Sequence, residues 1–270
     1  MSRTKIIANY YQQFDLDYSL DVHAEGFKGW TRGEIEMDFD RTALIVMHAW
    51  DNGTPETNPR GYRCQEYLSR ANKILTTVFP MLLLAVRASK LNIFHLAAGW
   101  KDTKYKKHPN YLAAVDLAGP NPNSSPERME PDYLFDLHSR SILTAGAHNV
   151  NWPRFDRHFA PETIPQGEEP IAENDHQLFA LCKKNNINHL IYAGFAVNEC
   201  MMFGSGGMRQ MYARNILCST IRQATTAIEN KESARLELHK EAELWKVSMT
   251  TGFVFDLDDF LDALRRRDKK

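Results

Sequence analysis

The sequence predicts a single α/β domain whose mostly parallel sheet is covered by helices on both faces. Continuous apolar runs recur along the chain, as at residues 43–47 and 189–194, and such runs are typical of strands buried on both faces. Segments with helical spacing separate these runs, and the alternation of strand and helix favours a parallel sheet. At 270 residues the chain is long enough to bury a sizeable core as one domain.

The elements predicted from these patterns follow one another from residue 43 to the C-terminus. They are a strand at 43–47, a helix over 62–89 that Pro80 kinks or splits, a strand at 91–96, a helix at 175–186, a strand at 189–194, a helix from about residue 200, a strand at 216–220, a helix at 230–246, a strand at 253–255 and an amphipathic helix at 257–266.

Two segments do not fit the alternation. Residues 1–33 mix aromatic and polar side chains with little periodicity, which indicates an N-terminal arm that wraps the domain at 34–270 or a partner subunit. Residues 98–170 hold most of the 12 prolines of the chain and predict a long irregular insertion. Long loops inside a compact domain usually act as lids or interfaces.

The composition excludes several classes of protein. The formal net charge is −1, with 33 Lys and Arg against 34 Asp and Glu, so we expect no nucleic-acid partner. We expect no signal peptide, because the first ten residues lack a continuous apolar run, and the longest apolar run, at residues 79–86, is too short to span a bilayer. The four cysteines show no CxxC spacing. A cytoplasmic protein with reduced thiols and no membrane partner is the expectation.

Polar side chains follow three of the predicted strands. Ligands of open parallel sheets bind beyond the carboxyl ends of the strands, so these side chains are candidates for a site. They are His48, Trp50 and Asp51 after the first strand, His95 and Trp100 at the second, and the run 194–200 after the third. No cluster has metal-ligand spacing, so we expect neither a metal nor a cofactor.

Cys200 is the strongest candidate for a nucleophile. It follows a strand and a glycine turn, and we expect it at the first turn of a helix, where the positive helix end favours a thiolate. The alternative is a buried core cysteine, because free cysteine is among the most buried residue types. Cys64, Cys182 and Cys218 fall inside predicted elements and are interpreted as core residues.

The segment around Cys200 resembles the isochorismatase-like cysteine hydrolases. Residues 190–201 read LIYAGFAVNECM, similar to the family's apolar strand followed by G-F-A-T-N-x-C, and residues 223–227 read QATTA, like its D-A-T-A-A turn. The resemblance covers roughly residues 40–262 and implies a three-layer α/β/α sandwich. It also implies hydrolysis of small amides or a vinyl ether through Cys, Asp and Lys. It further implies a cis peptide at Ala196–Val197 that aims the Val197 and Cys200 N–H groups at a substrate oxygen.

The sequence departs from that family at two catalytic positions. His48 stands where the family has its Asp, and Glu173 stands in the place of the Lys. One interpretation is a rebuilt site, in which His48 takes the Cys200 proton and Glu173 or Asp51 orients the imidazole. The other is a protein that has lost catalysis and only binds a small molecule or acts as a scaffold.

The remaining candidates are secondary. Asp51 is either a second acid or a turn residue in Asp-Asn-Gly, and Asn198 either lines the pocket or holds its own turn. Trp50, His95 and Trp100 are expected to contact a small-molecule substrate, together with other aromatic residues of the insertion. The aromatic arm and the family resemblance predict a homo-oligomer.

Overall fold

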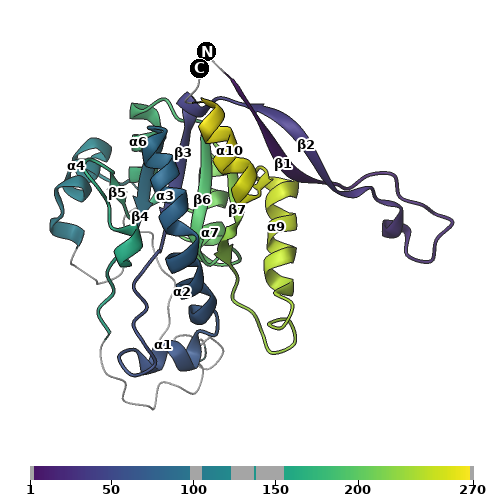
Figure 1. Ribbon diagram of the computed structural model, residues 1–270, viewed down its shortest axis with the longest axis horizontal. Helices are drawn as coiled ribbons and strands as arrows, with labels where there is room; N and C mark the ends of the chain where they lie inside the picture. Colours follow the sequence, from purple (N-terminus) through teal and green to yellow (C-terminus); the bar gives the residue numbers. More distant parts are fainter. Residues whose placement is uncertain (1–2, 98–104, 123–136, 138–154, 268–270) are drawn as a thin grey trace.

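The computed structural model describes residues 3–97, 105–122, 137 and 155–267, and it has one eight-stranded sheet at its centre (Figure 1). The strand order is β2-β1-β8-β7-β6-β3-β4-β5. The strands are β1 (Thr4–Gln12), β2 (Gly29–Met37), β3 (Thr42–Met47), β4 (Asn92–Leu96), β5 (Ile171–Ala172), β6 (His189–Phe195), β7 (Leu217–Thr226) and β8 (Val254–Phe255). Adjacent strands from β8 to β5 are parallel and β1 is antiparallel to both its neighbours, which confirms the predicted mostly parallel sheet.

Helices cover both faces of the sheet and complete the predicted three-layer sandwich. They are α1 (Pro59–Cys64), α2 (Leu68–Thr77), α3 (Phe79–Ala88), α4 (Pro109–Ala118), α6 (Asp175–Lys184), α7 (Cys200–Phe203), α8 (Met208–Tyr212), α9 (Leu238–Thr250) and α10 (Leu257–Arg267). One core cluster joins the sheet to α2, α3 and α10, and a second joins its other face to α4, α6, α7, α8 and α9.

Strand β3 shows why a continuous apolar run specifies the centre of this sandwich. All six of its residues are buried. Leu44 and Val46 point into the cluster under α2, α3 and α10, whereas Ala43, Ile45 and Met47 point into the opposite cluster. Successive side chains of a strand alternate between faces, so a strand covered on both sides must be apolar at every position.

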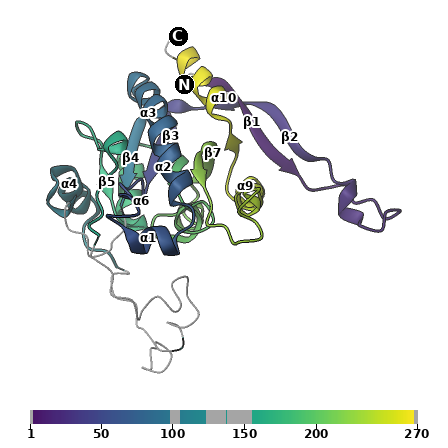
Figure 2. The ribbon, with the colours of Figure 1, turned by 60° about the horizontal axis from the view of Figure 1, so that its bottom comes forward.

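The N-terminal segment, which the sequence predicted to be an arm, forms a long β-hairpin. Strands β1 and β2 pair along their full length, and β2 extends to Met37, beyond the expected end of the arm at residue 33. The base of the hairpin joins the sheet through Asn9 opposite Val254. Figures 1 and 2 both show the turn end of the hairpin, residues 13–28, standing away from the body of the molecule.

Local turn chemistry moved several helix boundaries away from their predicted positions. The helix expected over 62–89 is three helices, and Pro80 lies in the first turn of α3, where proline is tolerated. The helix expected at 230–246 begins at Leu238, because Asn230 Oδ1 accepts hydrogen bonds from the N–H groups of Glu232 and Ser233 and holds a turn. The insertion expected to be irregular contains α4, which begins at Pro109.

Among the described residues no single helix is long and apolar enough to cross a bilayer. Helices α2 and α3 have that length and apolarity only when taken together, and they are bent by 42° relative to each other.

Candidate active site

The candidate site lies where β3 and β6 end beside each other. The two strands are paired up to Met47 and Gly194, so His48 and the segment leading to Cys200 leave the sheet at the same edge. Gly194 has φ +138, and a Cβ at this position would lie 1.9 Å from the Met47 carbonyl oxygen. Only glycine fits between the two main chains here, which explains the glycine that precedes the cysteine segment.

The segment before Cys200 corrects two predictions about the backbone. The cis peptide bond joins Phe195 to Ala196, one bond earlier than expected. The Val197 N–H donates to the Thr226 carbonyl oxygen at 3.0 Å and is therefore not free to bind a substrate oxygen. The reason is that β7 runs to Thr226, further than the sequence predicted, and its last carbonyl group reaches Val197.

The Cys200 N–H differs from that of Val197. Cys200 is the first residue of α7, so its N–H has no partner inside the helix. Within the described part of the chain no other backbone carbonyl accepts from it either, whereas the Ala196 carbonyl accepts from the N–H groups of Glu199 and Met201. The Cys200 N–H is thus the one predicted oxyanion donor that the described backbone leaves available.

The thiol of Cys200 is held in its neutral form, contrary to the sequence prediction. Burial and the charge of Glu199 raise its pKa from 9.0, and the charge of Arg157 opposes them. Helix α7 has only four residues, so its dipole is too small to outweigh burial. Cys200 packs partly buried against the core, and it becomes a thiolate only when a base or a charge change assists it.

His48 is a buried, neutral imidazole. Its backbone has φ +50, its exposed fraction is 9%, and its ring stacks on Trp50 with centroids 5.9 Å apart. Burial and the nearby charge of Arg157 lower its pKa from 6.5 to about 4. At neutral pH His48 can therefore accept a proton, but it is not the imidazolium that would stabilise a thiolate in the resting site.

Arg157 is the site residue that the sequence did not reveal. Its charge lowers the pKa of Cys200, His48 and Tyr67, so its guanidinium lies near all three side chains. The charge of Arg157 does not decide the state of Tyr67, because burial and the Cys200 thiol outweigh it and raise the pKa of Tyr67 to about 12. The phenol of Tyr67 therefore stays protonated. Arg157 lies in the proline-rich insertion, where no periodic pattern indicates which side chain turns toward the sheet.

The structure does not bring the two predicted carboxylates to His48. Asp51 Oδ1 accepts from the Gly53 N–H at 2.9 Å, and Asp51 Oδ2 lies 3.1 Å from His158 Nε2, so Asp51 is a turn residue with its own partner. Glu173 Oε2 lies 3.4 Å from Lys106 Nζ and its charge acts on Tyr111. Glu173 follows the edge strand β5, which two strand spacings, roughly 10 Å, separate from β3.

Two residues predicted to bind substrate are occupied by structural bonds. Asn198 Nδ2 donates to the Ile228 carbonyl and its Oδ1 accepts from the Ile228 N–H, both at 2.9 Å, so the side chain clamps the loop after β7. His95 is fully buried, and its Nε2 lies 2.8 Å from Glu169 Oε2. Although burial opposes it, hydrogen bonding from His95 and Arg87 lowers the pKa of Glu169 to about 2.

Of the two tryptophans predicted to contact a substrate, the structure describes only Trp50. Trp50 is 8% exposed and stacks on Phe159 and Tyr105, with centroids 5.3 and 6.2 Å apart, so its ring supports His48 from within an aromatic cluster. Trp100 lies outside the described residues. In the part of the chain that the structure describes, no three His, Cys, Asp or Glu side chains gather in a way that could hold a metal ion.

Comparison with known proteins identifies the fold. No protein-family model and no curated protein matches the sequence. Among solved structures, the chain is similar to a cysteine hydrolase from Pseudomonas syringae pv. phaseolicola 1448A, at 14% identity over 86% of this chain and 95% of that one, with a TM-score of 0.52. It is also similar to an isochorismatase-like hydrolase from Alkaliphilus metalliredigens, at 16% identity over 84% and 99% of the two chains, with a TM-score of 0.50.

The chain has the isochorismatase-like fold. This confirms, at the level of the fold, the resemblance first seen in residues 190–201. At such low identity the likeness extends to the fold alone.

A network of charged side chains holds the end of strand β7, next to the segment that leads to Cys200. Arg70 Nε donates to Thr226 Oγ1 at 3.0 Å and its guanidinium binds both oxygens of Glu66, at 2.7 and 2.8 Å. Glu66 also accepts from the Glu229 N–H at 2.7 Å. Since Thr226 in turn holds Val197, this network fixes the position from which the chain turns toward Cys200.

Proposed function

We propose that this protein is a thiol-dependent hydrolase of a small amide or a related C–N bond. The observation that supports the proposal is that His48 and the segment leading to Cys200 leave the sheet at the same edge, after the paired strands β3 and β6, and that the charge of Arg157 acts on both side chains. A nucleophile beside a neutral base and a fixed cation is a suitable set for acyl transfer.

The reaction would begin from two neutral groups. His48 takes the thiol proton while the sulfur of Cys200 attacks the substrate carbonyl carbon, and a tetrahedral oxyanion forms. The C–N bond then breaks, the amine leaves with the proton from His48, and the acyl group remains on sulfur. Water, deprotonated by His48, attacks the thioester and releases the acid and the free thiol.

Arg157 and the Cys200 N–H have complementary roles in this scheme. The cation of Arg157 stabilises negative charge on sulfur or on the oxyanion. Glu173, which stands in the place of the Lys of the isochorismatase-like hydrolases, is a carboxylate and cannot supply this positive charge. The Cys200 N–H supplies one hydrogen bond to the oxyanion. Positive charge near a buried sulfur matters more than it would in water, because the low dielectric screens it less.

A second candidate function is a small-molecule-binding protein without catalysis. The raised pKa of the Cys200 thiol favours it, because a protonated thiol is a poor nucleophile. The two functions differ in one property that can be measured without knowing the substrate, namely the reactivity of Cys200 toward an alkylating agent.

The first test is the rate of iodoacetamide alkylation of each cysteine against pH, read by mass spectrometry of peptides, in the wild type and in His48→Gln. We expect Cys200 to react faster than Cys64, which is also partly exposed, and to lose this advantage in His48→Gln. Cys182 and Cys218 are buried and serve as unreactive references.

A panel of small primary amides then tests turnover by ammonia release. Cys200→Ser is expected to abolish hydrolysis, whereas Cys64→Ser leaves it unchanged. If Cys200 reacts no faster than Cys64 and no amide is cleaved, the hydrolase is rejected in favour of the binding protein.

A further inference from the structure

The turn end of the N-terminal hairpin is an exposed apolar surface that the other described residues of the chain do not cover. Residues 14–22 read FDLDYSLDV, in which apolar residues alternate with aspartates or serine. The apolar residues of this run are all exposed, at 37–76%: Phe14 46%, Leu16 44%, Tyr18 76%, Leu20 37% and Val22 56%. Soluble monomers rarely display so contiguous a set of large apolar side chains without a partner.

The strands of the same hairpin are attached to the body of the molecule by side-chain contacts close to the turn end. Arg32 binds both carboxylate oxygens of Asp259 at 2.7 Å, and Tyr11 packs edge-on against Trp245 with centroids 6.3 Å apart. Trp30 lies under the guanidinium of Arg222. Figures 1 and 2 show the hairpin directed away from α3 and α10 and past α9.

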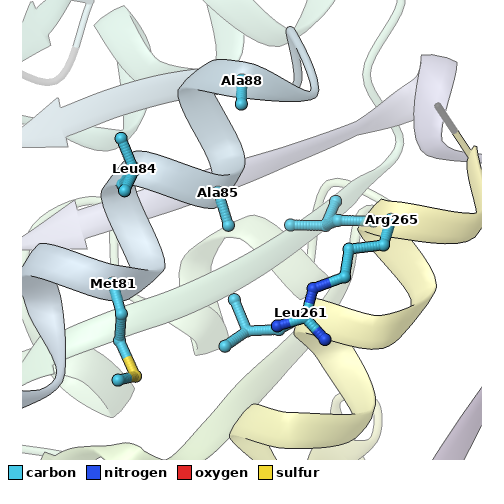
Figure 3. Close-up of a pocket in the computed structure, with 7 residues that line it drawn as sticks. Met81, Leu84, Ala85, Ala88, Leu261 and Arg265 are labelled. Carbon is cyan, nitrogen blue, oxygen red and sulfur yellow. The ribbon is translucent and has the colours of Figure 1, made fainter.

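A matching apolar surface lies on the body, between α3 and α10 (Figure 3). This groove has a volume of about 350 Å³ and is lined by Met81, Leu84, Ala85, Ala88, Leu261, Leu264 and Arg265. Leu84 is 72% exposed and Met81 is 48% exposed. Helix α3 therefore turns apolar side chains toward solvent as well as toward the core.

The two surfaces are complementary in charge as well as in polarity. The turn end carries four carboxylates, from Asp15, Asp17, Asp21 and Glu25, against the single lysine Lys28. Among the seven residues that line the groove, the charged one is Arg265, which is exposed and pairs with Asp262. An apolar segment edged with aspartate suits an apolar groove closed by an arginine.

We propose that the hairpin turn of one copy of this chain docks in the α3–α10 groove of a second copy. Burial of the exposed side chains on both surfaces drives the association, and the acidic residues of the turn select the arginine side of the groove. When both copies dock reciprocally, the two contacts close a symmetric dimer. The proposal is independent of the chemistry assigned to Cys200.

The test is the mass of the full chain in solution, by sedimentation velocity over a range of concentrations. We expect the wild type to have twice the monomer mass of 31.1 kDa. Leu84→Glu in the groove and the double variant Leu16→Ser/Tyr18→Ser in the turn are each expected to weaken dimerisation at least tenfold. Both variants should keep the far-UV circular dichroism spectrum of the wild type, since all three side chains are exposed and their replacement should not disturb the fold of the monomer.

Leu236→Glu is the matched control, because Leu236 is 69% exposed but belongs to neither surface, and it should leave the dimer intact. A mixture of the groove variant and the turn variant should form heterodimers, since one intact contact remains between them. A monomeric wild type would overturn the proposal. A dimer that both variants leave unchanged would overturn it too, and would place the interface elsewhere.

Discussion

The reactivity of Cys200 depends on how three influences act on one sulfur atom. Burial and Glu199 favour the neutral thiol, and Arg157 favours the thiolate. His48 does not contribute charge, because its pKa of about 4 leaves it neutral near pH 7. Of these groups, Arg157 alone is a cation that favours ionisation of the sulfur, so its contribution can be isolated by substitution.

Replacing Arg157 should make Cys200 less reactive. In Arg157→Gln the favourable charge is lost while burial and Glu199 remain, so alkylation of Cys200 should be several-fold slower at pH 8 and require higher pH. Arg157→Lys retains the charge and should preserve most of the rate. The measurement is the pH profile of alkylation, and equal profiles for Gln and Lys would show that charge at residue 157 does not act on the sulfur.

At the scale of elements, the site depends on the close approach of β3 and β6. The two strands meet where Gly194 passes the Met47 carbonyl, just before the chain turns toward Cys200. The same edge is held from the other side by β7, whose Thr226 accepts from Val197 and is itself bound by Arg70. A change in the spacing of these three strands would therefore move the cysteine segment as a whole.

Gly194→Ala should disrupt this arrangement. The new Cβ would lie 1.9 Å from the Met47 carbonyl oxygen, and φ +138 is unfavourable for any residue with a side chain. We expect the free energy of unfolding to fall by more than about 3 kcal/mol, measured by urea denaturation. Gly167→Ala is the control: its φ of +56 is also positive but no atom lies within 4 Å, so the loss should be about 1 kcal/mol. Equal losses would mean that steric contact at Gly194 is unimportant.

The strands were predictable because burial on both faces forces uninterrupted apolar runs, as in β3 and β6. The edge rule for parallel sheets then located Cys200 and His48. Contacts made across long sequence separations left no such pattern. Arg157 reaches the site from the insertion, and Thr226 reaches Val197 because β7 is longer than its apolar run. The carboxylate predicted at Asp51 failed for a different reason, because a local contact to the Gly53 N–H holds it in the Asp-Asn-Gly turn, the alternative that the sequence left open.

At the scale of the whole molecule, the fold buries histidines that would be charged in an acidic solution. His48 and His189 each have a pKa lowered from 6.5 to about 4, chiefly by burial, and burial also lowers the pKa of His95. The unfolded chain therefore binds more protons than the native chain between about pH 6.5 and pH 4. Stability is fully present above pH 6.5 and falls as the pH decreases through this window.

The expected loss is large enough to measure by urea denaturation. Between pH 7.5 and pH 5, His48 and His189 should each account for about 2 kcal/mol of lost unfolding free energy. The quantity to compare is the difference in unfolding free energy between pH 7.5 and pH 5. His48→Gln should reduce this difference by the contribution of His48, whatever the substitution does to stability at pH 7.5. Leu236→Gln, a change at an exposed residue that does not titrate, should leave that difference unchanged. A pH dependence that His48→Gln does not reduce would mean that the native state admits a proton or water at His48. The imidazole of His48 would then be charged in mild acid, and in that pH range it could not act as the base for Cys200.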